Sequence, residues 1–242
     1  MTEAFEITGL PSEGGVLIVA DHASNHVPQD VDLGIPPQYL EDHIAYDPGT
    51  AAIARLMTEN SGYLAILGTV SRLVVDLNRY PDEDSLIPKR SDGVEIPGND
   101  ISATERQARL DRHFTPYHDR VRELVSDLKP ALVLSLHSFT PTLRTNPQLE
   151  RPWDIGILYN QYAIASRFAL QFLDAEGLLN VGDQLPYSGK ELNATMNRQC
   201  EAIGQPYFGV ELRQDLIMEP AGQRRFADIL LRICDKIRTA LA

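Results

Sequence analysis

Two histidines, each at the end of an apolar run, are the first residues in this sequence that could do chemistry. The run in "VLIVADHASNH" (16–26) ends at Asp21 and His22, and "ALVLSLHS" (131–138) ends close to His137. Neutral imidazole is a common zinc ligand, and catalytic zinc usually takes three protein ligands and a water. If both runs are neighbouring parallel strands, their carboxyl ends meet at one edge of the sheet. The sequence therefore predicts a metal site that contains His22 and His137.

The third metal ligand is less clearly marked. Asn25 follows His22 by three residues, so a turn could direct both side chains at one ion. An amide oxygen is a weaker donor than a carboxylate, and Asp21, Asp47 and Asp76 are therefore alternatives. The preferred metal is Zn²⁺, although another divalent ion is possible. Three further histidines are interpreted as structural: His26, His43 and His118.

A carboxylate stands inside the late apolar stretch "FGVELRQD". Burial of an isolated charge is costly, so Glu211 is expected either to form an ion pair or to have a functional role. One interpretation is an ion pair with Arg213 or another arginine. The other is a general base that takes a proton from a metal-activated water.

Arginines gather in "SRLVVDLNR" (71–79). Its alternation predicts a strand with Arg72, Asp76 and Asn78 on one face and Arg79 just beyond. A guanidinium matches a carboxylate or a developing oxyanion. A structural pair between Asp76 and an arginine is the alternative.

The elements that must position these residues alternate along the chain. Apolar strand-like runs are predicted at 14–22, twice within 63–79, and at 131–138, 154–160 and 206–215. Helical spacing is predicted at 47–61, 102–129, 162–176 and 222–241. Near-continuous apolar strands between helices indicate an α/β fold, with a central mixed, mostly parallel sheet covered by helices on both faces. No linker or repeat divides the chain, so a single domain over 1–242 is expected.

Composition narrows the function classes. The chain has 242 residues, 43% of them hydrophobic, and a net charge of -12, which disfavours binding to nucleic acid or to an anionic membrane. No apolar run reaches the roughly 18 to 20 residues of a membrane span, and the N-terminus lacks a signal-peptide pattern, so a cytoplasmic location is expected. Cys200 and Cys234 match no metal-binding spacing and are expected to be reduced thiols. The oligomeric state stays open.

Taken together, these motifs resemble the N-formylglutamate amidohydrolase family over most of the chain. That family is similar in turn to the zinc carboxypeptidase and aspartoacylase superfamily, which shares an α/β fold with a central mixed sheet. The resemblance rests on the order and number of seven motifs: "DHASNHVP" (21–28), "DPGT" (47–50), "SRLVVDLNR" (71–79), "PYH" (116–118), "LHSFTP" (136–141), "PYS" (186–188) and "VELRQDL" (210–216).

The resemblance implies a role for each motif. His22-Ala-Ser-Asn25 stands where the superfamily has His-x-x-Glu, a departure that bears on the third ligand and on the affinity for the metal. His137 matches the later metal histidine and Glu211 the general base, while Arg72 would polarise the scissile carbonyl.

The same resemblance implies a substrate site. The "DLNR" motif would place Asn78 and Arg79 on the substrate carboxylate. Arg213, which is not part of that motif, is a further candidate for binding the same carboxylate. Tyr187, in the loop-like "LPYSGKELNAT", could donate a hydrogen bond to the substrate, although a plain turn residue is an equal alternative.

The expected function is metal-dependent hydrolysis of N-formyl-L-glutamate, or of a similar small acidic N-acyl amino acid, by metal-activated water. The alternatives are a zinc amidase or peptidase for another small N-acyl amino acid or peptide, and a catalytically inactive carboxylate-binding protein on the same fold.

Overall fold

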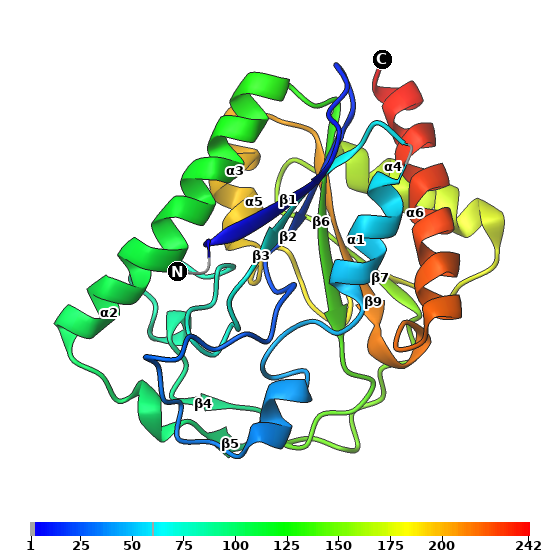
Figure 1. Cartoon of the computed structure of the whole chain (residues 1–242). Coiled ribbons are helices and arrows are strands. Elements are labelled where there is room, and N and C mark those ends of the chain that lie inside the picture. The colour runs from blue at the N-terminus through cyan, green and yellow to red at the C-terminus, as the bar shows by residue number, and fades with distance from the viewer. Residues whose placement is uncertain (1–2, 60) are drawn as a thin grey trace.

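A seven-stranded mixed sheet forms the centre of the computed structural model, which describes residues 3–59 and 61–242 (Figure 1). The strands, in sheet order, are β1 (Phe5–Gly9), β3 (Leu64–Gly68), β2 (Val16–Ala20), β6 (Leu132–Phe139), β9 (Tyr207–Arg213), β7 (Ile155–Leu158) and β8 (Val181–Asp183). Strands β3, β2, β6 and β9 run parallel, whereas β1 and β7 lie antiparallel to their inner neighbours. A small hairpin of β4 (Arg90–Ser91) and β5 (Val94–Glu95) lies apart from this sheet.

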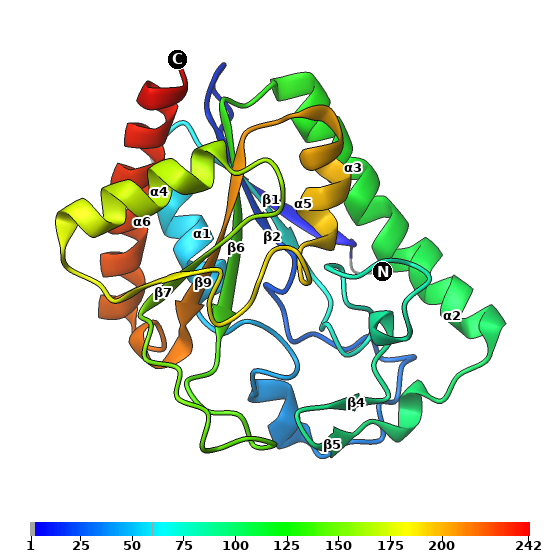
Figure 2. The same cartoon turned by 180° about the vertical axis from the view of Figure 1, so that it is seen from behind.

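Helices cover both faces of the sheet, as Figures 1 and 2 show from opposite sides. One face carries α1 (Thr50–Thr58), α4 (Ile164–Glu176) and α6 (Pro220–Leu241). The other face carries α3 (Thr115–Leu128) and α5 (Ala194–Gln199), and a π-helical turn (Leu110–Phe114) joins α3 to α2 (Ala103–Arg109). Short 3₁₀ turns in the described chain lie at Pro37–Glu41, Asp84–Leu86, Pro97–Asn99, Glu201–Ile203 and Gln214–Leu216.

Each face of the sheet has its own apolar core. Every residue of β2 is buried, because alternate side chains enter the two cores: Ile18 packs with the α1, α4 and α6 layer and Leu17 with the α3 and α5 layer. The buried side chains of α6, such as Phe226, Leu230 and Ile233, recur at helical spacing along one side. The predicted α/β class, with a mostly parallel sheet covered on both faces, is confirmed.

The prediction of a second strand within 63–79 is wrong. Residues 71–79 form turns, in which Val74 and Val75 donate backbone hydrogen bonds to the Ser71 carbonyl. The apolar residues of this segment are buried in the core beneath α3, outside the sheet. A short apolar run reports burial, and its periodicity does not show whether the buried backbone is a strand or a series of turns.

Strand β1 was not anticipated. It is an outer strand whose central residues, Glu6 and Ile7, are exposed, so it lacks the apolar run by which the inner strands are recognised. None of the helices among the described residues has both the length and the apolar character that crossing a membrane requires.

Candidate active site

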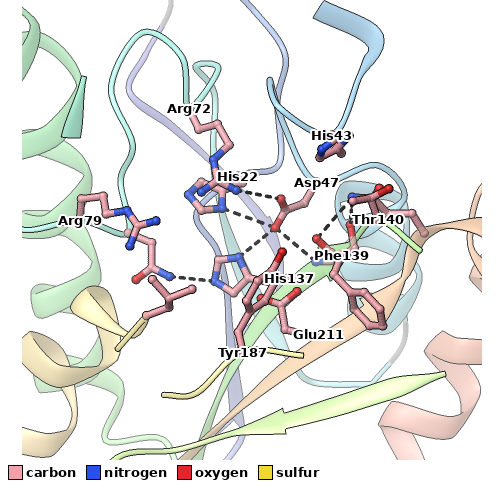
Figure 3. Close-up of a pocket in the computed structure, with 14 residues that line it drawn as sticks. His22, His43, Asp47, Arg72, Arg79, His137, Phe139, Thr140, Tyr187 and Glu211 are labelled. Atoms are coloured by element: carbon pink, nitrogen blue, oxygen red, sulfur yellow. Dashed lines mark hydrogen bonds and ion pairs between the residues drawn. The ribbon is translucent and has the colours of Figure 1, made fainter. Parts of the chain in front are cut away.

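The parallel strands bring the chemistry together at one edge of the sheet. Asp21 and His22 follow β2 directly, His137 lies near the end of β6, and Glu211 lies near the end of β9. His137 and Glu211 are paired across β6 and β9 in the strand register. A cavity of about 160 Å³ opens here (Figure 3). Its lining residues are His22, His43, Asp47, Arg72, Asn78, Arg79, His137, Ser138, Phe139, Thr140, Tyr187, Leu192, Glu211 and Gln214.

Asp47 enters the site from the segment that precedes α1. Its backbone N–H donates to the His22 carbonyl at 2.9 Å, and the Thr50 hydroxyl donates to the Asp47 carbonyl at 2.7 Å. Between Asp47 and Thr50, Gly49 has a φ of 85°, and a Cβ at this position would lie 2.7 Å from the Ile217 carbonyl oxygen. Glycine is therefore needed for the close approach that fixes Asp47 beneath the two histidines.

His22, Asp47 and His137 form a buried cluster whose potential ligand atoms all lie within 4.8 Å of one another. Asp47 Oδ2 is 2.9 Å from His137 Nδ1 and 3.4 Å from His22 Nδ1, as the dashed lines of Figure 3 show. His22 Nδ1 is buried and has no hydrogen-bond partner in the described part of the chain. Two imidazole nitrogens and one carboxylate oxygen that face a common point are a donor set that suits zinc.

The outer nitrogens of both imidazoles face carboxylates. His22 Nε2 is 2.7 Å from Asp76 Oδ1, and His137 Nε2 is 3.5 Å from Asp21 Oδ2. Asp21 in turn accepts a hydrogen bond of 2.8 Å from the Tyr117 hydroxyl. Histidines that bind metal usually donate their other N–H to a carboxylate in this way, which fixes the tautomer and turns the Nδ1 atoms inward.

The pKa values of two carboxyl groups in the cavity, Asp47 and Glu211, are shifted in opposite directions. Burial alone would raise the pKa of Asp47, but the neighbouring His22 and His137 lower it overall, so Asp47 is ionised. For Glu211 the effect of burial outweighs the opposing charges of His137 and Arg72, and burial raises its pKa to about 7. Glu211 Oε2 is buried without a hydrogen-bond partner among residues 3–59 and 61–242. A carboxyl group with these properties can both accept and return a proton at neutral pH.

The arginines differ in how far they are already paired. Arg72 donates from both Nε and Nη2 to Asp76 Oδ2, at 3.1 and 2.7 Å, and its Nη1 lies 3.5 Å from Asp47. Arg79 reaches only to 3.9 Å from Asp76, and its Nε has no hydrogen-bond partner in the described chain. Asn78 lies beside Arg79, with its amide nitrogen 3.5 Å from His137 Nε2. The cavity therefore presents the Arg79 guanidinium as a cation available to an anionic ligand.

Two residues predicted for the site lie outside the cavity. The amide nitrogen of Asn25 donates to Glu41 at 3.2 Å, and Asn25 is not among the lining residues. Asp47, one of the carboxylate alternatives, lies beside His22 and His137 instead. Arg213 donates to Asp215 at 2.8 Å and lies 3.4 Å from Asp154, so it forms the ion pairs of a structural arginine.

Several residues that line the cavity were given no role from the sequence. Ser138 and Gln214 lie at the ends of the strand runs predicted at 131–138 and 206–215, and Thr140 lies just beyond the first of these runs; this position was the available signal. His43 was interpreted as structural, yet it lines the cavity while lying 2.6 Å from Asp42 and 3.1 Å from Asp92. No sequence pattern marked these loop contacts, because they depend on how separate loops fold over the sheet edge.

Known proteins share both sequence and fold with this chain. A sequence profile of the N-formylglutamate amidohydrolase family matches residues 14–218. The solved structure of gene product Atu2144 from Agrobacterium tumefaciens is 32% identical and has a TM-score of 0.91, over 99% of this chain and 96% of that one. N-formylglutamate amidohydrolase from Ralstonia eutropha JMP134 is 18% identical with a TM-score of 0.75, over 98% of each chain, and so shares the fold. No protein of curated function matches the chain. The chain belongs to the N-formylglutamate amidohydrolase family and is a hydrolase of amide C–N bonds.

Proposed function

We propose that this protein is a zinc-dependent amidohydrolase that cleaves the N-formyl group from N-formyl-L-glutamate. The observation that carries the proposal is the juxtaposition, in one cavity, of the His22–Asp47–His137 cluster with Glu211, whose Oε2 has no hydrogen-bond partner among the described residues. Membership of the family indicates the class of reaction. The Arg79 guanidinium, which is only loosely paired with Asp76, supports an acidic substrate.

The residues of the cluster fit a zinc ion. His22 Nδ1, His137 Nδ1 and an Asp47 carboxylate oxygen would hold it, because the orphaned His22 Nδ1 faces Asp47 and both outer nitrogens are held by carboxylates. When bound, the ion supplies Lewis-acid chemistry: it polarises a carbonyl and makes water a stronger nucleophile at neutral pH.

Glu211 acts as the general base. It takes a proton from water as the water oxygen adds to the formyl carbon, and it returns that proton to the amide nitrogen as the C–N bond breaks. The products are formate and L-glutamate. A pKa of about 7, raised by burial, suits Glu211 to both transfers.

The arginines bind and orient the substrate. Arg79 and Asn78 would hold a substrate carboxylate, since Arg79 makes only a long contact of 3.9 Å with Asp76 and its Nε has no hydrogen-bond partner in the described chain. Arg72 is held in place by Asp76, and its Nη1 is available to the oxygen of the scissile carbonyl as negative charge develops there. Loss of one such donor typically lowers the rate by about 10²- to 10³-fold.

A substrate panel tests the proposal. Purified protein with zinc is expected to release glutamate from N-formyl-L-glutamate faster than it cleaves N-acetyl-L-glutamate, N-formyl-L-leucine or a Glu-containing dipeptide. A preference for the acetyl or dipeptide substrate would contradict the proposed N-formyl substrate and would indicate that the enzyme removes a different acyl group. Binding of glutamate without turnover of any substrate would instead indicate an inactive carboxylate-binding protein.

A further inference from the structure

A buried arginine lies behind the wall of the cavity. Arg151 is only 6% exposed, and none of the ion pairs found in the described chain includes it. Its Nη1 donates to the Thr140 carbonyl at 2.9 Å, and its Nη2 donates to the Tyr187 hydroxyl oxygen at 2.9 Å. A buried cation without an acidic partner carries a large desolvation cost, so its retention calls for a physical reason.

Arg151 contacts the substrate cavity only through the residues that line it. Its guanidinium carbon lies 4.9 Å from the ring centre of Tyr187 and 5.8 Å from that of Phe139. Both aromatic residues and Thr140 line the cavity, whereas Arg151 does not. Aromatic faces stabilise a cation, so the positive charge is held directly behind the cavity wall.

The hydrogen bond to Tyr187 fixes the direction of the phenolic proton. A guanidinium can only donate, so the Tyr187 oxygen is the acceptor, and its own O–H must point elsewhere. No residue within 3–59 or 61–242 accepts that proton in a hydrogen bond, and the ring projects toward Glu211 and the histidine cluster in Figure 3. Burial raises the pKa of Tyr187, so the hydroxyl stays protonated at neutral pH.

We propose that Arg151 is a positioning residue, which makes Tyr187 an obligate hydrogen-bond donor to an anionic oxygen of the substrate. This inference rests on the proposed amidohydrolase function. The positive charge behind the phenol strengthens its donation to an anion, because charge-assisted hydrogen bonds are the stronger ones and neighbouring bonds polarise one another. The anionic oxygen is either a substrate carboxylate or the oxyanion that develops during attack on the carbonyl.

A double-mutant cycle tests the pairing. R151M and Y187F are each expected to lower kcat/KM for N-formyl-L-glutamate by roughly 10- to 100-fold, the range for loss of a hydrogen bond to a charged group. The kcat/KM of the double variant is expected to be no lower than that of the less active single variant, because Arg151 acts through the Tyr187 hydroxyl. R151K, which keeps a cationic donor, is expected to recover part of the loss. Independent, multiplying losses in the double variant would overturn the proposal.

The cycle has a structural control and two arms. R109M removes another buried arginine, one that lies outside the cavity and donates to Asn99 and the Val74 carbonyl, so it is expected to lower Tm without changing kcat/KM. If R151M does not fold, R151Q takes its place in the cycle. A loss confined to KM assigns the Tyr187 hydroxyl to a substrate carboxylate, and a loss confined to kcat assigns it to the oxyanion.

The outcome is separable from that of the proposed function. Binding of L-glutamate, measured by calorimetry on the same variants, does not require turnover. An active wild-type protein whose R151M variant matches it in both turnover and glutamate affinity would overturn the positioning role alone. A wild-type protein that neither hydrolyses N-formyl-L-glutamate nor binds glutamate would overturn both proposals.

Discussion

Asp47 is the residue on which the proposed metal site depends most at the scale of single side chains. It faces both imidazoles and takes the place that the His-x-x-Asn spacing would have assigned to Asn25. The sequence contained a signal for it, because Asp47 stands directly before a helical pattern in "DPGT". What the sequence could not show is that the chain after His22 turns away, which leaves Asn25 bonded to Glu41.

Substitution of this carboxylate separates the two candidate ligands. Asp47→Asn keeps the shape of the side chain but removes its charge, and it is expected to lower the zinc content well below one ion per chain. Asn25→Ala serves as the matched control and is expected to retain the metal. Elemental analysis of both proteins, purified without chelator, makes the measurement. The reverse pattern would restore Asn25 as the ligand.

Glu211 is the second residue with a separable role. Glu211→Gln is expected to lower kcat by about 10²- to 10⁴-fold, because the amide cannot accept the proton. Its zinc content and fold should be unchanged, since Glu211 is not in the metal cluster and its buried Oε2 has no partner among the described residues. Turnover and metal content are measured on the same sample. Near-wild-type turnover would exclude Glu211 as the base.

At the scale of elements, the turn that leads into α1 holds the site in place. The strands β2, β6 and β9 were predictable, because buried parallel strands read as continuous apolar runs. The proximity of His22, His137 and Glu211 was predictable from the same runs, since the carboxyl ends of parallel strands share one sheet edge. The turns at 71–79 and the edge strand β1 were not predictable, because an apolar run indicates burial but not backbone conformation, and an exposed edge strand lacks an apolar run.

Gly49 permits a direct test of this turn. Gly49→Ala is expected to destabilise the protein by at least about 1 kcal/mol more than Gly177→Ala, because its new methyl group meets the Ile217 carbonyl. Gly177 is the matched control, since it also has a positive φ of 62° but no atom within 4 Å of a built Cβ. Chemical denaturation compares the two variants. Equal destabilisation would show that the close approach to Ile217 is unimportant.

At the scale of the whole molecule, the two apolar cores are joined through one sheet whose strands come from both ends of the chain. We therefore propose that the chain is a single domain.

The helical layer of α3 also buries two ionisable groups outside the cavity. His118 Nε2 donates to the Leu77 carbonyl at 2.9 Å, and His113 lies in the π-helical turn before α3.

These histidines are expected to make the fold sensitive to acid. Burial lowers the pKa of His113 and of His118 to about 4, against an ordinary value of 6.5 in the unfolded chain. Above pH 6.5 both histidines are neutral in the folded and in the unfolded chain, so their burial does not make the free energy of unfolding depend on pH there. As pH falls from 6.5 toward 4, the unfolded chain binds the protons first, so each histidine lowers the free energy of unfolding by at most about 1.4 kcal/mol per pH unit.

The acid effect is measured by chemical denaturation of the wild-type protein and of the His113→Gln and His118→Gln variants at pH 7.5 and pH 5. The variants are expected to lose less stability than the wild type between the two pH values. An identical loss in all three proteins would show that neither histidine contributes to the acid sensitivity.

The central claim is that His22, Asp47 and His137 hold an ion on which hydrolysis depends, and removal of metal tests it most directly. Turnover of N-formyl-L-glutamate is measured before chelation, after chelation, and after zinc is returned, with metal content determined at each stage. The predicted result is loss of activity with the metal and recovery when one zinc per chain is restored. Full turnover by protein shown to contain no metal would contradict the account.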